Sequence, residues 1–492
     1  MIEGQHTDVP SAAPVASQLL GDARGHAQSH GQSPRQSPAL SRFEHFAEQY
    51  LNFERTPAKD SLWLEGMRWL CERLGNPQEG IPCVHVAGSK GKGSTAAMIA
   101  CALKEAGYTV GLYTSPHVSH FAERIGEPTG PFAESVYERS VERLIQLVQA
   151  SEGSYPRGRR PTWFELATAL CFLCFKEARV DFAVYEVGLG GRLDSTNVVH
   201  PRCTCVTRIE KEHTQWLGDT LEQIAREKAG IFKRGVPAVV FSPDEPLKAV
   251  FRNVAQEKGC PLVFADEMMS SSTPVHKIIR TPATGAVRAV KTQLTLSISC
   301  LEHPLELSLS LAGSFQSHNA AVAAIALKTI LPSIDEGTIE LGLSAACLSA
   351  RFELIDLEHT PWHGCTLILD VSHTPSSVAC TMQTLDAAFP TADFPHRVLL
   401  FACASDKDVG SIAPLFKDKF SCVFLTTPGQ SLRADLDKTR RAFDHAAISY
   451  TATGECRSAA KAALDEAASC EGLVLAVGSF YLACELKAML SE

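Results

Sequence analysis

The chain has 492 residues, which at roughly 150 residues per domain predicts about three domains, although two larger ones fit as well. Of these residues 45% are apolar and 21% are charged, a composition that excludes collagen, coiled coils and wholesale disorder. Subtracting 55 acidic from 46 basic residues gives a net charge of −9, so no overall positive field attracts nucleic acid or anionic lipid. Apolar runs such as LCFLCF (170–175) fall far short of the ~20 residues of a membrane span, and we expect a cytoplasmic protein.

Residues 1–40 are rich in Ser, Pro, Gly, Gln and His and contain no Phe, Trp or Tyr. Such a segment cannot bury enough apolar surface to offset the entropy lost on ordering. It lacks the apolar stretch of a secretory signal, and Glu3, Asp8 and Asp22 are atypical of a transit peptide. We therefore expect a disordered N-terminal tail.

From Phe43 the pattern becomes helical through SLWLEGMRWLCERLG (61–75), where Trp63, Met67, Leu70 and Leu74 recur at helical spacing and Gly75 ends the helix. Short apolar strands then alternate with amphipathic helices, which predicts a parallel sheet with crossover helices. The expected strands are 82–88, 110–115, 180–188, 202–209 and 237–242, and the expected helices are 94–107, 164–178 and 221–232.

The pattern changes between about 262 and 311, where apolar and polar residues alternate, as in QLTLSISC. This alternation predicts a small antiparallel excursion, which a helix in 314–330 follows. At about residue 350 a second alternation of strands and helices begins. The expected fold is α/β, with a P-loop-type parallel-sheet ATPase domain over 41–350 and a smaller Rossmann-like α/β domain over 351–492.

The 17 cysteines, an odd number, are scattered through apolar stretches, as Cys101 and Cys403 are. In a chain of this length that pattern indicates the reduced, buried thiols of a cytosolic protein. Cys171 and Cys174 form a C-x-x-C, but they lie in an expected core helix, and the sequence supplies no second pair of zinc ligands. We therefore assign this pair neither metal nor redox chemistry.

The strongest local signal is HVAGSKGKGST (85–95), a strand that ends in a glycine-rich turn and opens into a helix. Gly88, Gly91 and Gly93 allow close backbone approach, the helix N-terminus faces an anion, and Lys92 adds a point charge. We interpret the turn as a phosphate cradle, although Gly93 separates Lys92 from Ser94 and so breaks the pattern G-x-x-x-x-G-K-[ST]. The pattern alone leaves open a tight turn without a ligand.

Glu186 in YEVGLGGRLDSTN (185–197) ends an expected buried strand, at the edge where α/β sheets bind ligands. A carboxylate beside a phosphate cradle suits Mg²⁺, which prefers hard oxygen ligands, whereas a structural cap explains the residue alone equally well. His213 and Lys228 follow in IEKEHTQWLGDTLEQIAREKAGIFKRG (209–235). Each by itself is more typical of a loop histidine and a solvated helix lysine.

Several motifs occur in a fixed order along the chain. They are GSKGKGST, TSPHVSHFAERI (114–125), TWFE (162–165), EVGLGGRLDSTN, the EH…LG…EKAGIFK block and LAGSFQSHNA (311–320). Together they resemble the folylpolyglutamate synthase and dihydrofolate synthase group of the Mur ligase superfamily. The resemblance runs from about residue 45 to the end of the chain.

The resemblance implies a two-metal ATP site. Ser115 and Glu186 would hold one Mg²⁺, and His213 with Glu186 a second. Lys228 would be carbamylated, which converts an ammonium into an anionic metal ligand. The ATP phosphates would be bound by Gly91, Lys92, Gly93 and Ser94.

The resemblance also implies contacts to the rest of the nucleotide and to the substrate. Adenosine contacts fall on Asn319, Arg351 and Asp370, with His373 in the same loop as Asp370. The pterin end of the substrate falls on Thr162, Phe164 and Asp194.

The sequence departs from the family pattern at several of these positions. The interdomain W-P-G-R reads LSARFE (348–353), which keeps Arg351, and D-G-A-H-[NT] reads DVSHT (370–374), where Val371 replaces glycine. The usual Asp-His is Glu212-His213, and Lys90 replaces an asparagine common in bacterial members. No proposed ligand is lost, so we expect an active enzyme.

These parts imply amide bond formation driven by ATP. The γ-phosphoryl group passes to a substrate carboxylate while Lys92 and two Mg²⁺ neutralise its charge, and the amine of L-glutamate attacks the acyl phosphate. The expected enzyme is a monomer that adds glutamate to dihydropteroate, to reduced folates or to both, and hinge closure brings in the glutamate held by the smaller domain. In that domain Asp406, Lys407 and Asp408 are candidate participants, with a solvated loop as the equal alternative.

Two other functions remain open from the sequence. One is a related amide ligase that acts on a different carboxylate, because the pterin pocket is the least constrained part. The other is a non-catalytic nucleotide-binding protein in which the altered DVSHT turn has ended turnover.

Overall fold

The computed structural model of the chain describes residues 37–52, 63–281, 285–429 and 434–492. Most of the expected N-terminal tail, residues 1–36, lies outside them. Helix α1 (Pro38–Ala47) already begins inside the stretch expected to be a tail. Its start is explained by local chemistry, because the Ser37 hydroxyl accepts a hydrogen bond from the Leu40 N–H at 3.1 Å and Pro38 suits the first helical position.

A seven-stranded sheet forms the centre of the first part of the chain, in the order β3-β2-β4-β1-β5-β6-β7. All neighbours pair in parallel except β2 and β3, which are antiparallel. The carboxyl ends of the parallel strands therefore meet at one edge. The strands are β1 (Cys83–Ala87), β2 (Val110–Tyr113), β3 (Ile125–Gly126), β4 (Phe182–Glu186), β5 (Cys203–Val206), β6 (Ala238–Val240) and β7 (Leu262–Phe264).

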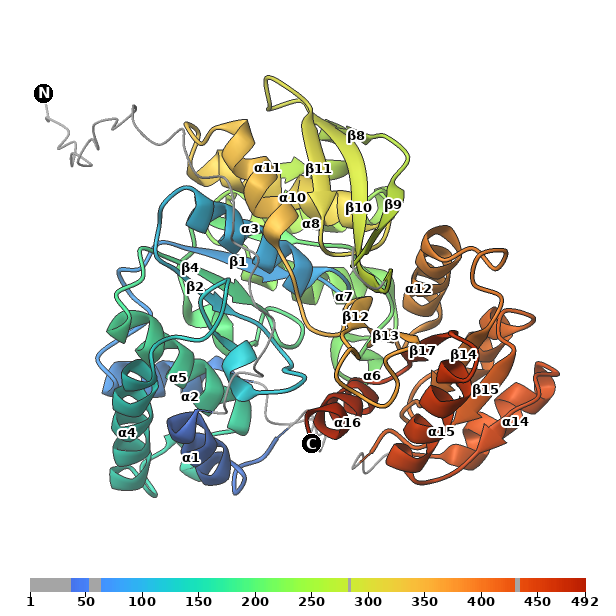
Figure 1. Cartoon of the computed structure of the whole chain (residues 1–492). Helices are drawn as coiled ribbons and strands as arrows, with labels where there is room; N and C mark the ends of the chain where they lie inside the picture. Colours follow the sequence, from blue (N-terminus) through green and yellow to red (C-terminus); the bar gives the residue numbers. More distant parts are fainter. Residues whose placement is uncertain (1–36, 53–62, 282–284, 430–433) are drawn as a thin grey trace, which may run out of the picture. The chain divides into compact units, whose positions relative to one another are not determined.

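Helices cover both faces of this sheet. Alternate strand residues such as Val84 and Val184 pack with α3, α10 and α11, which Figure 1 shows grouped together. The residues between them, such as Ala183, pack with α1, α2, α4 and α5, or with α7 and α8. The helices are α2 (Leu64–Arg73), α3 (Lys92–Glu105), α4 (Glu134–Ala150), α5 (Trp163–Glu177), α6 (Thr214–Leu217), α7 (Leu221–Lys228), α8 (Glu245–Lys258), α9 (Ala265–Met268), α10 (Gln316–Ile330) and α11 (Glu336–Ala345).

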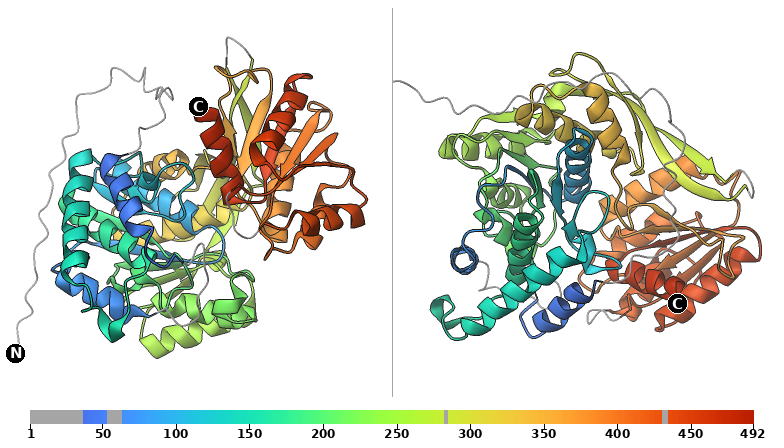
Figure 2. Two further views of the ribbon diagram at one scale, coloured as in Figure 1. Left: turned by 90° about the horizontal axis from the view of Figure 1, so that it is seen from below. Right: turned by 60° about the vertical axis from the view of Figure 1, so that its left-hand side comes forward.

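The antiparallel excursion forms a four-stranded sheet in which β10 pairs with β8, β9 and β11. It begins later than expected, because residues 262–264 form β7 of the parallel sheet. Its strands β9 and β10 also pack against α12 and β12 of the C-terminal part, and the right-hand view of Figure 2 shows them there in yellow-green beside the orange elements. The strands are β8 (Met269–Ser271), β9 (Val275–Arg280), β10 (Val287–Ile298) and β11 (Leu305–Leu309).

A six-stranded sheet begins at residue 353, in the order β12-β13-β17-β14-β15-β16, and only β12 is antiparallel to its neighbour. Helices α12, α13 and α14 pack on one face, and α15 and α16 on the other. The strands are β12 (Glu353–Ile355), β13 (Thr366–Asp370), β14 (Arg397–Phe401), β15 (Cys422–Leu425), β16 (Thr451–Ala452) and β17 (Leu473–Val477). The helices are α12 (Pro375–Ala388), α13 (Val409–Ile412), α14 (Leu436–His445), α15 (Cys456–Ala468) and α16 (Phe480–Ser491).

The predicted α/β class is therefore confirmed, with a large parallel sheet, an antiparallel excursion and a second α/β sheet. The division at residue 350 stays a prediction, although the change of sheet falls close to it.

The cysteines of the chain are free thiols. Cys171 and Cys174 are fully buried in α5, and burial raises the pKa of the Cys171 thiol, as expected of core residues. Not all of the cysteines are buried as expected, since Cys300 and Cys347 are exposed.

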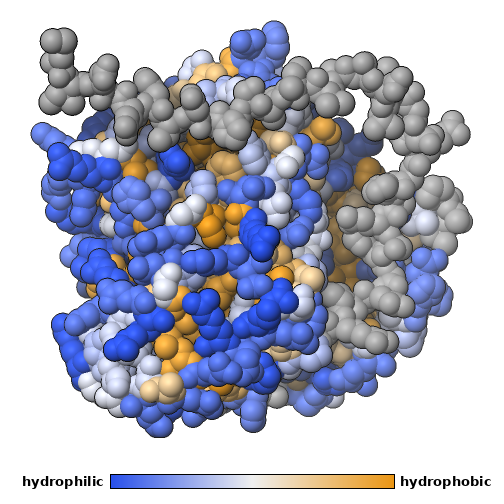
Figure 3. Space-filling view, turned by 90° about the vertical axis from the view of Figure 1, so that its left-hand side faces the viewer, coloured by the Kyte–Doolittle hydropathy of each residue, from blue (hydrophilic) through white to orange (hydrophobic). Residues whose placement is uncertain are grey.

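Among the residues described, none of the helices combines the length and apolar character that a membrane crossing requires. On the face in Figure 3, hydrophobic residues reach the surface only in limited areas between hydrophilic ones.

Candidate active site

The glycine-rich turn lies at the carboxyl end of β1 and leads directly into α3. Gly91 caps the helix with a φ of 88°, in the left-handed region that favours glycine. The first N–H groups of α3 have no acceptor within the helix, which leaves the turn at Lys92, Gly93 and Ser94 suited to an anion. Gly88 is equally constrained, since a Cβ there would lie 1.8 Å from the Thr207 hydroxyl oxygen.

Lys228, at the end of α7, reaches underneath this turn. Its Nζ donates to the Gly88 carbonyl oxygen at 2.7 Å and to Glu212 Oε1 at 3.0 Å. Its side chain is only 2% exposed, and burial lowers its pKa to about 8 although Glu212 opposes that shift. The reading of Lys228 as a solvated helix residue is therefore wrong.

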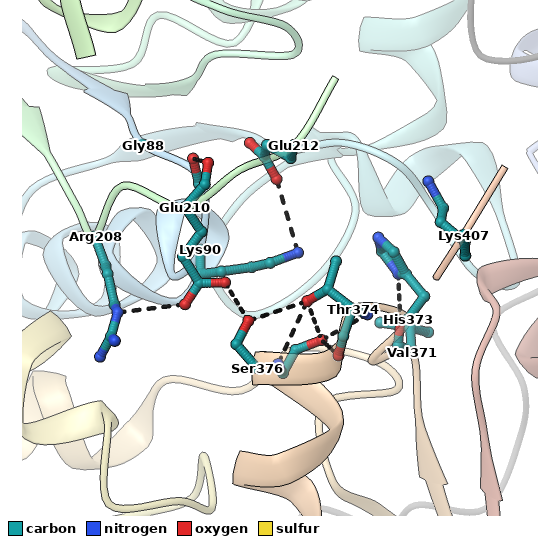
Figure 4. Close-up of polar contacts among 12 residues, drawn as sticks. Gly88, Lys90, Arg208, Glu210, Glu212, Val371, His373, Thr374, Ser376 and Lys407 are labelled. Atoms are coloured by element: carbon teal, nitrogen blue, oxygen red, sulfur yellow. Dashed lines mark hydrogen bonds and ion pairs between the residues drawn. The ribbon is translucent and has the colours of Figure 1, made fainter. Parts of the chain in front are cut away.

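Glu212 has a second lysine beside it. Lys90 Nζ lies 3.7 Å from Glu212 Oε2, and Figure 4 shows the two side chains pointing toward each other. Burial by itself would raise the Glu212 pKa, but Lys228, Lys92 and Lys90 outweigh burial and lower it to about 2. Glu212 is thus a permanent anion among three lysines.

Glu186 ends β4 next to the glycine turn, on the strand beside β1. It is 5% exposed, and its Oε2 accepts a hydrogen bond from the Ser115 N–H at 3.0 Å. A Cβ on Gly93 would lie 3.3 Å from the same oxygen. Burial raises the Glu186 pKa, which Lys92 opposes. The carboxylate, the Ser115 residue and the start of α3 therefore meet at one point.

His213 follows Glu212 in the loop after β5 and is exposed, with a left-handed backbone φ of 49°. The described part of the chain contains no cluster of three or more His, Cys, Asp or Glu side chains able to hold a metal ion. Mg²⁺ commonly uses only one or two carboxylates and completes its shell with water and substrate phosphate. The hard oxygen atoms of Glu186 and Ser115 fit that pattern, and the metal assignments stay predictions.

Asn319, in the second turn of α10, contacts the glycine turn. A Cβ on Gly91 would lie 2.1 Å from Asn319 Oδ1, and Asn319 Nδ2 donates to Gln316 Oε1 at 2.8 Å. The Asn319 side chain thus lies beside Gly91, where the glycine turn leads into α3. This position is compatible with a contact to a nucleotide bound at the turn.

Arg351 lies just before β12, and Asp370 ends the neighbouring strand β13. Asp370 accepts from the N–H groups of Phe352 and Ser372, both at 2.8 Å, and so joins the linker to the DVSHT turn. The Arg351 guanidinium lies 4.9 Å from the centre of the Phe480 ring, and burial lowers the Arg351 pKa against the pull of Asp370 and Glu186.

His373 lies in the DVSHT turn and interacts through Nδ1 with the Val371 carbonyl oxygen at 2.8 Å. Burial, together with Lys90 and Lys407, lowers the His373 pKa to about 3. Lys407 carries its charge on the loop after β14, paired with Asp406 at 3.0 Å. Figure 4 shows His373 and Lys407 near Lys90 and Glu212, so loops that follow strands of the two sheets bring these side chains together. Asp408 instead caps α13 through the Ser411 N–H at 3.1 Å.

The structure places the expected pterin contacts in different surroundings. Phe164 packs against the loop that follows Glu186, because a Cβ on Gly188 would lie 2.4 Å from its ring. Thr162 caps α5 by accepting from the Glu165 N–H at 3.2 Å, and it lines a cavity of about 420 Å³. The aromatic residues Tyr50 and Trp63 and the basic residues Arg159 and Arg160 line the same cavity, together with Gln49, Leu51 and Pro161.

Asp194 has an internal role in its loop. It is 3% exposed, and its carboxylate accepts from the Leu189 N–H at 2.9 Å and the Thr196 N–H at 3.0 Å. These bonds hold the turn that carries Gly188 and Gly191, so Asp194 shapes the surface next to Phe164.

Sequence reasoning left three charged residues without a role: Lys90, Glu210 and Glu212. The signal was present, because IEKEH places alternating charges directly after a buried strand whose end faces the glycine turn. Ser89 and Lys90 in fact donate their N–H groups to the Arg208 carbonyl oxygen at 2.9 and 3.2 Å.

Family models and individual relatives match this arrangement. Residues 86–327 match the Mur ligase middle domain, and residues 350–480 match the Mur ligase glutamate ligase domain. A dihydrofolate synthase/folylpolyglutamate synthase of Bacillus subtilis is 31% identical over 429 residues, covering 86% of this chain and 93% of that protein. A probable bifunctional folylpolyglutamate synthase/dihydropteroate synthase of Haloferax volcanii is 33% identical over 430 residues, but the chain spans only 48% of its length.

A solved structure shares the fold. The Mycobacterium tuberculosis folylpolyglutamate synthase, solved with ADP and AMPPCP, has a TM-score of 0.76 and 26% identity, with 92% of this chain and 98% of that chain covered. The fold and the matched domains define an ATP-binding ligase of the Mur type. The chain belongs to the Mur ligase family and, within it, to the group of folylpolyglutamate and dihydrofolate synthases.

Proposed function

We propose that this chain is an ATP-dependent ligase that joins L-glutamate to the carboxylate of a folate or of dihydropteroate. The observation that carries the proposal is the meeting of the glycine turn, Glu186 and Lys228 at one edge of the parallel sheet. Such an edge is where α/β proteins bind nucleotides.

The nucleotide phosphates would bind at Gly91, Lys92, Gly93 and Ser94, where free N–H groups and a lysine converge. Asn319 contacts the same turn and would meet the adenosine, as would Arg351 and Asp370. Use of ATP fits the nucleotides bound in the Mycobacterium tuberculosis relative.

Glu186 and Ser115 would hold Mg²⁺, and His213 a second ion, to neutralise charge on the phosphates. Lys228 would become a metal ligand as a carbamate. Its buried amine suits this modification, because a pKa of about 8 leaves a share of the amine neutral near physiological pH. Lys90 would then supply the positive charge beside the carbamate and Glu212.

The folate would lie along Phe164, with the pterin end toward the cavity at Thr162, where Tyr50 and Trp63 offer aromatic faces to a planar ring. Asp194 would act by holding the loop under Phe164. L-Glutamate would approach from the C-terminal sheet, where His373 and Lys407 face the phosphate turn.

The reaction follows from this arrangement. A carboxylate oxygen of the folate attacks the γ-phosphorus, the bond to the bridging oxygen breaks, and ADP leaves with that electron pair. The neutral amine of glutamate then attacks the acyl carbon, phosphate departs, and the amide loses a proton. Lys92 stabilises the charge that develops on the transferred oxygens, while Asn319 and the glycine turn keep the nucleotide in line.

The division into domains at 41–350 and 351–492, action as a monomer and a cytoplasmic location complete the proposal. The free thiols throughout the chain favour a reducing compartment.

The test is ATP hydrolysis with purified protein and its dependence on both a folate and L-glutamate, with the product mass measured for dihydropteroate and for tetrahydrofolate. Turnover that needs both substrates and adds one glutamate residue to the product supports the proposal. Turnover with another carboxylate would indicate a related amide ligase, and nucleotide binding without turnover on any carboxylate would indicate a binding protein.

A further inference from the structure

The segment Arg208–Glu210 contacts both the phosphate turn and the C-terminal sheet's first helix. On one side it is bonded to the turn through its backbone: the Arg208 carbonyl oxygen accepts from Ser89 and Lys90, and the Glu210 carbonyl oxygen accepts from the Ser89 hydroxyl at 3.0 Å. A shift of the turn therefore moves this segment with it.

On the other side the Glu210 side chain reaches α12. Its Oε2 accepts a hydrogen bond from the Ser376 hydroxyl, across 166 positions of sequence, as Figure 4 shows. Its Oε1 lies 3.3 Å from Arg208 Nε, which orients the carboxylate. The Glu210 side chain is 18% exposed, so water screens this contact only in part.

Ser376 follows Pro375 at the start of α12, and hydrogen bonds join this end of the helix to the DVSHT turn. The Thr374 hydroxyl lies 2.8 Å from that of Ser377 and caps α12, while Thr381 and the Ser372 N–H both bind Asp370. His373 lies within this bonded stretch. A displacement of Ser376 therefore also displaces His373.

We propose that Glu210 is a positioning residue that couples nucleotide binding at the glycine turn to the position of the DVSHT turn, through its hydrogen bond to Ser376. The inference rests on the proposed function, because the DVSHT turn faces the site where glutamate would bind. Without the contact, ATP binds as before, but the DVSHT turn no longer responds to it.

The test is amide hydrogen exchange on the full chain, with and without AMPPCP, in wild type and in Glu210→Ala, Glu210→Gln, Ser376→Ala and Ser376→Thr. In wild type, AMPPCP should slow exchange both at 89–95 and at 373–380. In Glu210→Ala and Ser376→Ala only the first segment should respond. Glu210→Gln and Ser376→Thr keep an acceptor and a hydroxyl, so the second response should return in part.

Glu257→Ala is the matched control, because it removes another glutamate that pairs with an arginine, Arg226, without touching either turn. It should behave as wild type. In steady-state kinetics Glu210→Ala should raise the KM for L-glutamate about fivefold, the scale of one charge-assisted hydrogen bond that is partly exposed, and leave the KM for ATP within about twofold. The double variant Glu210→Ala/Ser376→Ala should be no worse than either single variant.

The inference is overturned if AMPPCP protects 89–95 but leaves 373–380 unchanged in wild type, or if Glu210→Ala keeps the wild-type response at 373–380. If 89–95 itself shows no response in wild type, the proposed nucleotide site fails together with the coupling. If the exchange results hold while the wild type makes no folate product, only the proposed substrate fails.

Discussion

Lys228 and Glu212 form a buried ion pair directly under the phosphate turn, 3.0 Å apart, with the same ammonium bonded to the Gly88 carbonyl oxygen. Lys228, on helix α7, thereby fixes both Gly88 at the start of the glycine turn and Glu212 in the loop after β5. The pair lies close enough to the proposed phosphate site that changes in either charge should affect catalysis.

Replacing Lys228 with alanine should reduce ligation by about a hundredfold or more, because the turn loses its anchor and the proposed metal ligand. Lys90 remains 3.7 Å from Glu212, so the carboxylate keeps a counter-charge and the protein should stay folded. Circular dichroism and product assays check both points. Lys233→Ala, which removes a half-buried lysine whose pKa burial also lowers to about 8, should retain most activity. Full activity of Lys228→Ala would remove it from the mechanism.

Carbamylation of Lys228 should rise with pH. The reaction consumes the neutral amine and CO₂ and releases a proton, and burial lowers the amine pKa from 10.5 to about 8. The neutral share, and with it the carbamate, should therefore increase between pH 7 and pH 9. A ¹³C NMR signal from ¹³C-labelled bicarbonate would report it. The signal should vanish in Lys228→Arg and persist in Lys233→Arg, and the reverse pattern would assign it to Lys233.

Glu186→Gln should abolish ligation and weaken metal binding, since the amide removes the negative charge of the carboxylate that the Ser115 N–H contacts. Electron paramagnetic resonance of Mn²⁺ with AMPPCP measures binding without turnover. Glu227→Gln, which removes a carboxylate paired with Arg192, serves as the control. Unchanged Mn²⁺ affinity in Glu186→Gln would contradict the metal assignment.

Gly91→Ala and Gly80→Ala separate crowding from backbone strain. Both glycines have similar positive φ angles, 88° and 83°, but only the Cβ at Gly91 meets a neighbour, Asn319. Gly80→Ala should cost about 1–2 kcal/mol of stability. Gly91→Ala should cost about 1–3 kcal/mol more and abolish AMPPCP binding. Urea unfolding and calorimetry measure these effects, and equal effects of the two variants would remove Asn319 from the site.

Phe164→Ala should raise the KM for the folate substrate about tenfold with little change in the KM for ATP, because the lost ring offers apolar contact worth about 1.5–3 kcal/mol when fully buried. Phe46→Ala truncates another half-buried phenylalanine of the same core and should leave both values unchanged. An increase in the KM for ATP alone would place Phe164 outside the substrate pocket.

The sequence predicted what depends on local pattern. Strand periodicity and the glycine turn predicted the parallel sheet and the ends of β1 and β4, and therefore where Lys92 and Glu186 lie. It could not predict burial of Lys228, because a lysine near the end of an amphipathic helix looks solvated until the fold brings Gly88 and Glu212 to it. The contact between Glu210 and Ser376 joins segments far apart in sequence, which no local pattern encodes.

Asp194 shows a different limit. Its position in a family motif pointed to the substrate, whereas its bonds to Leu189 and Thr196 follow from the turn it closes. A carboxylate two residues before a threonine is also a common way to stabilise a turn.

Helix α3 is buried on all sides from Ser94 to Leu103, and its contact with α11 is so close that a Cβ on Gly342 would lie 2.2 Å from the backbone of Ala102. A helix packed this way cannot slide or tilt without opening cavities in the core. The body of α3, from Ser94 to Leu103, therefore acts as a fixed reference point. Any movement of the C-terminal sheet relative to α3 has to be absorbed elsewhere. We expect it at the backbone beside Arg351, because Ala350 and Phe352 both hold positive φ angles near 50° there.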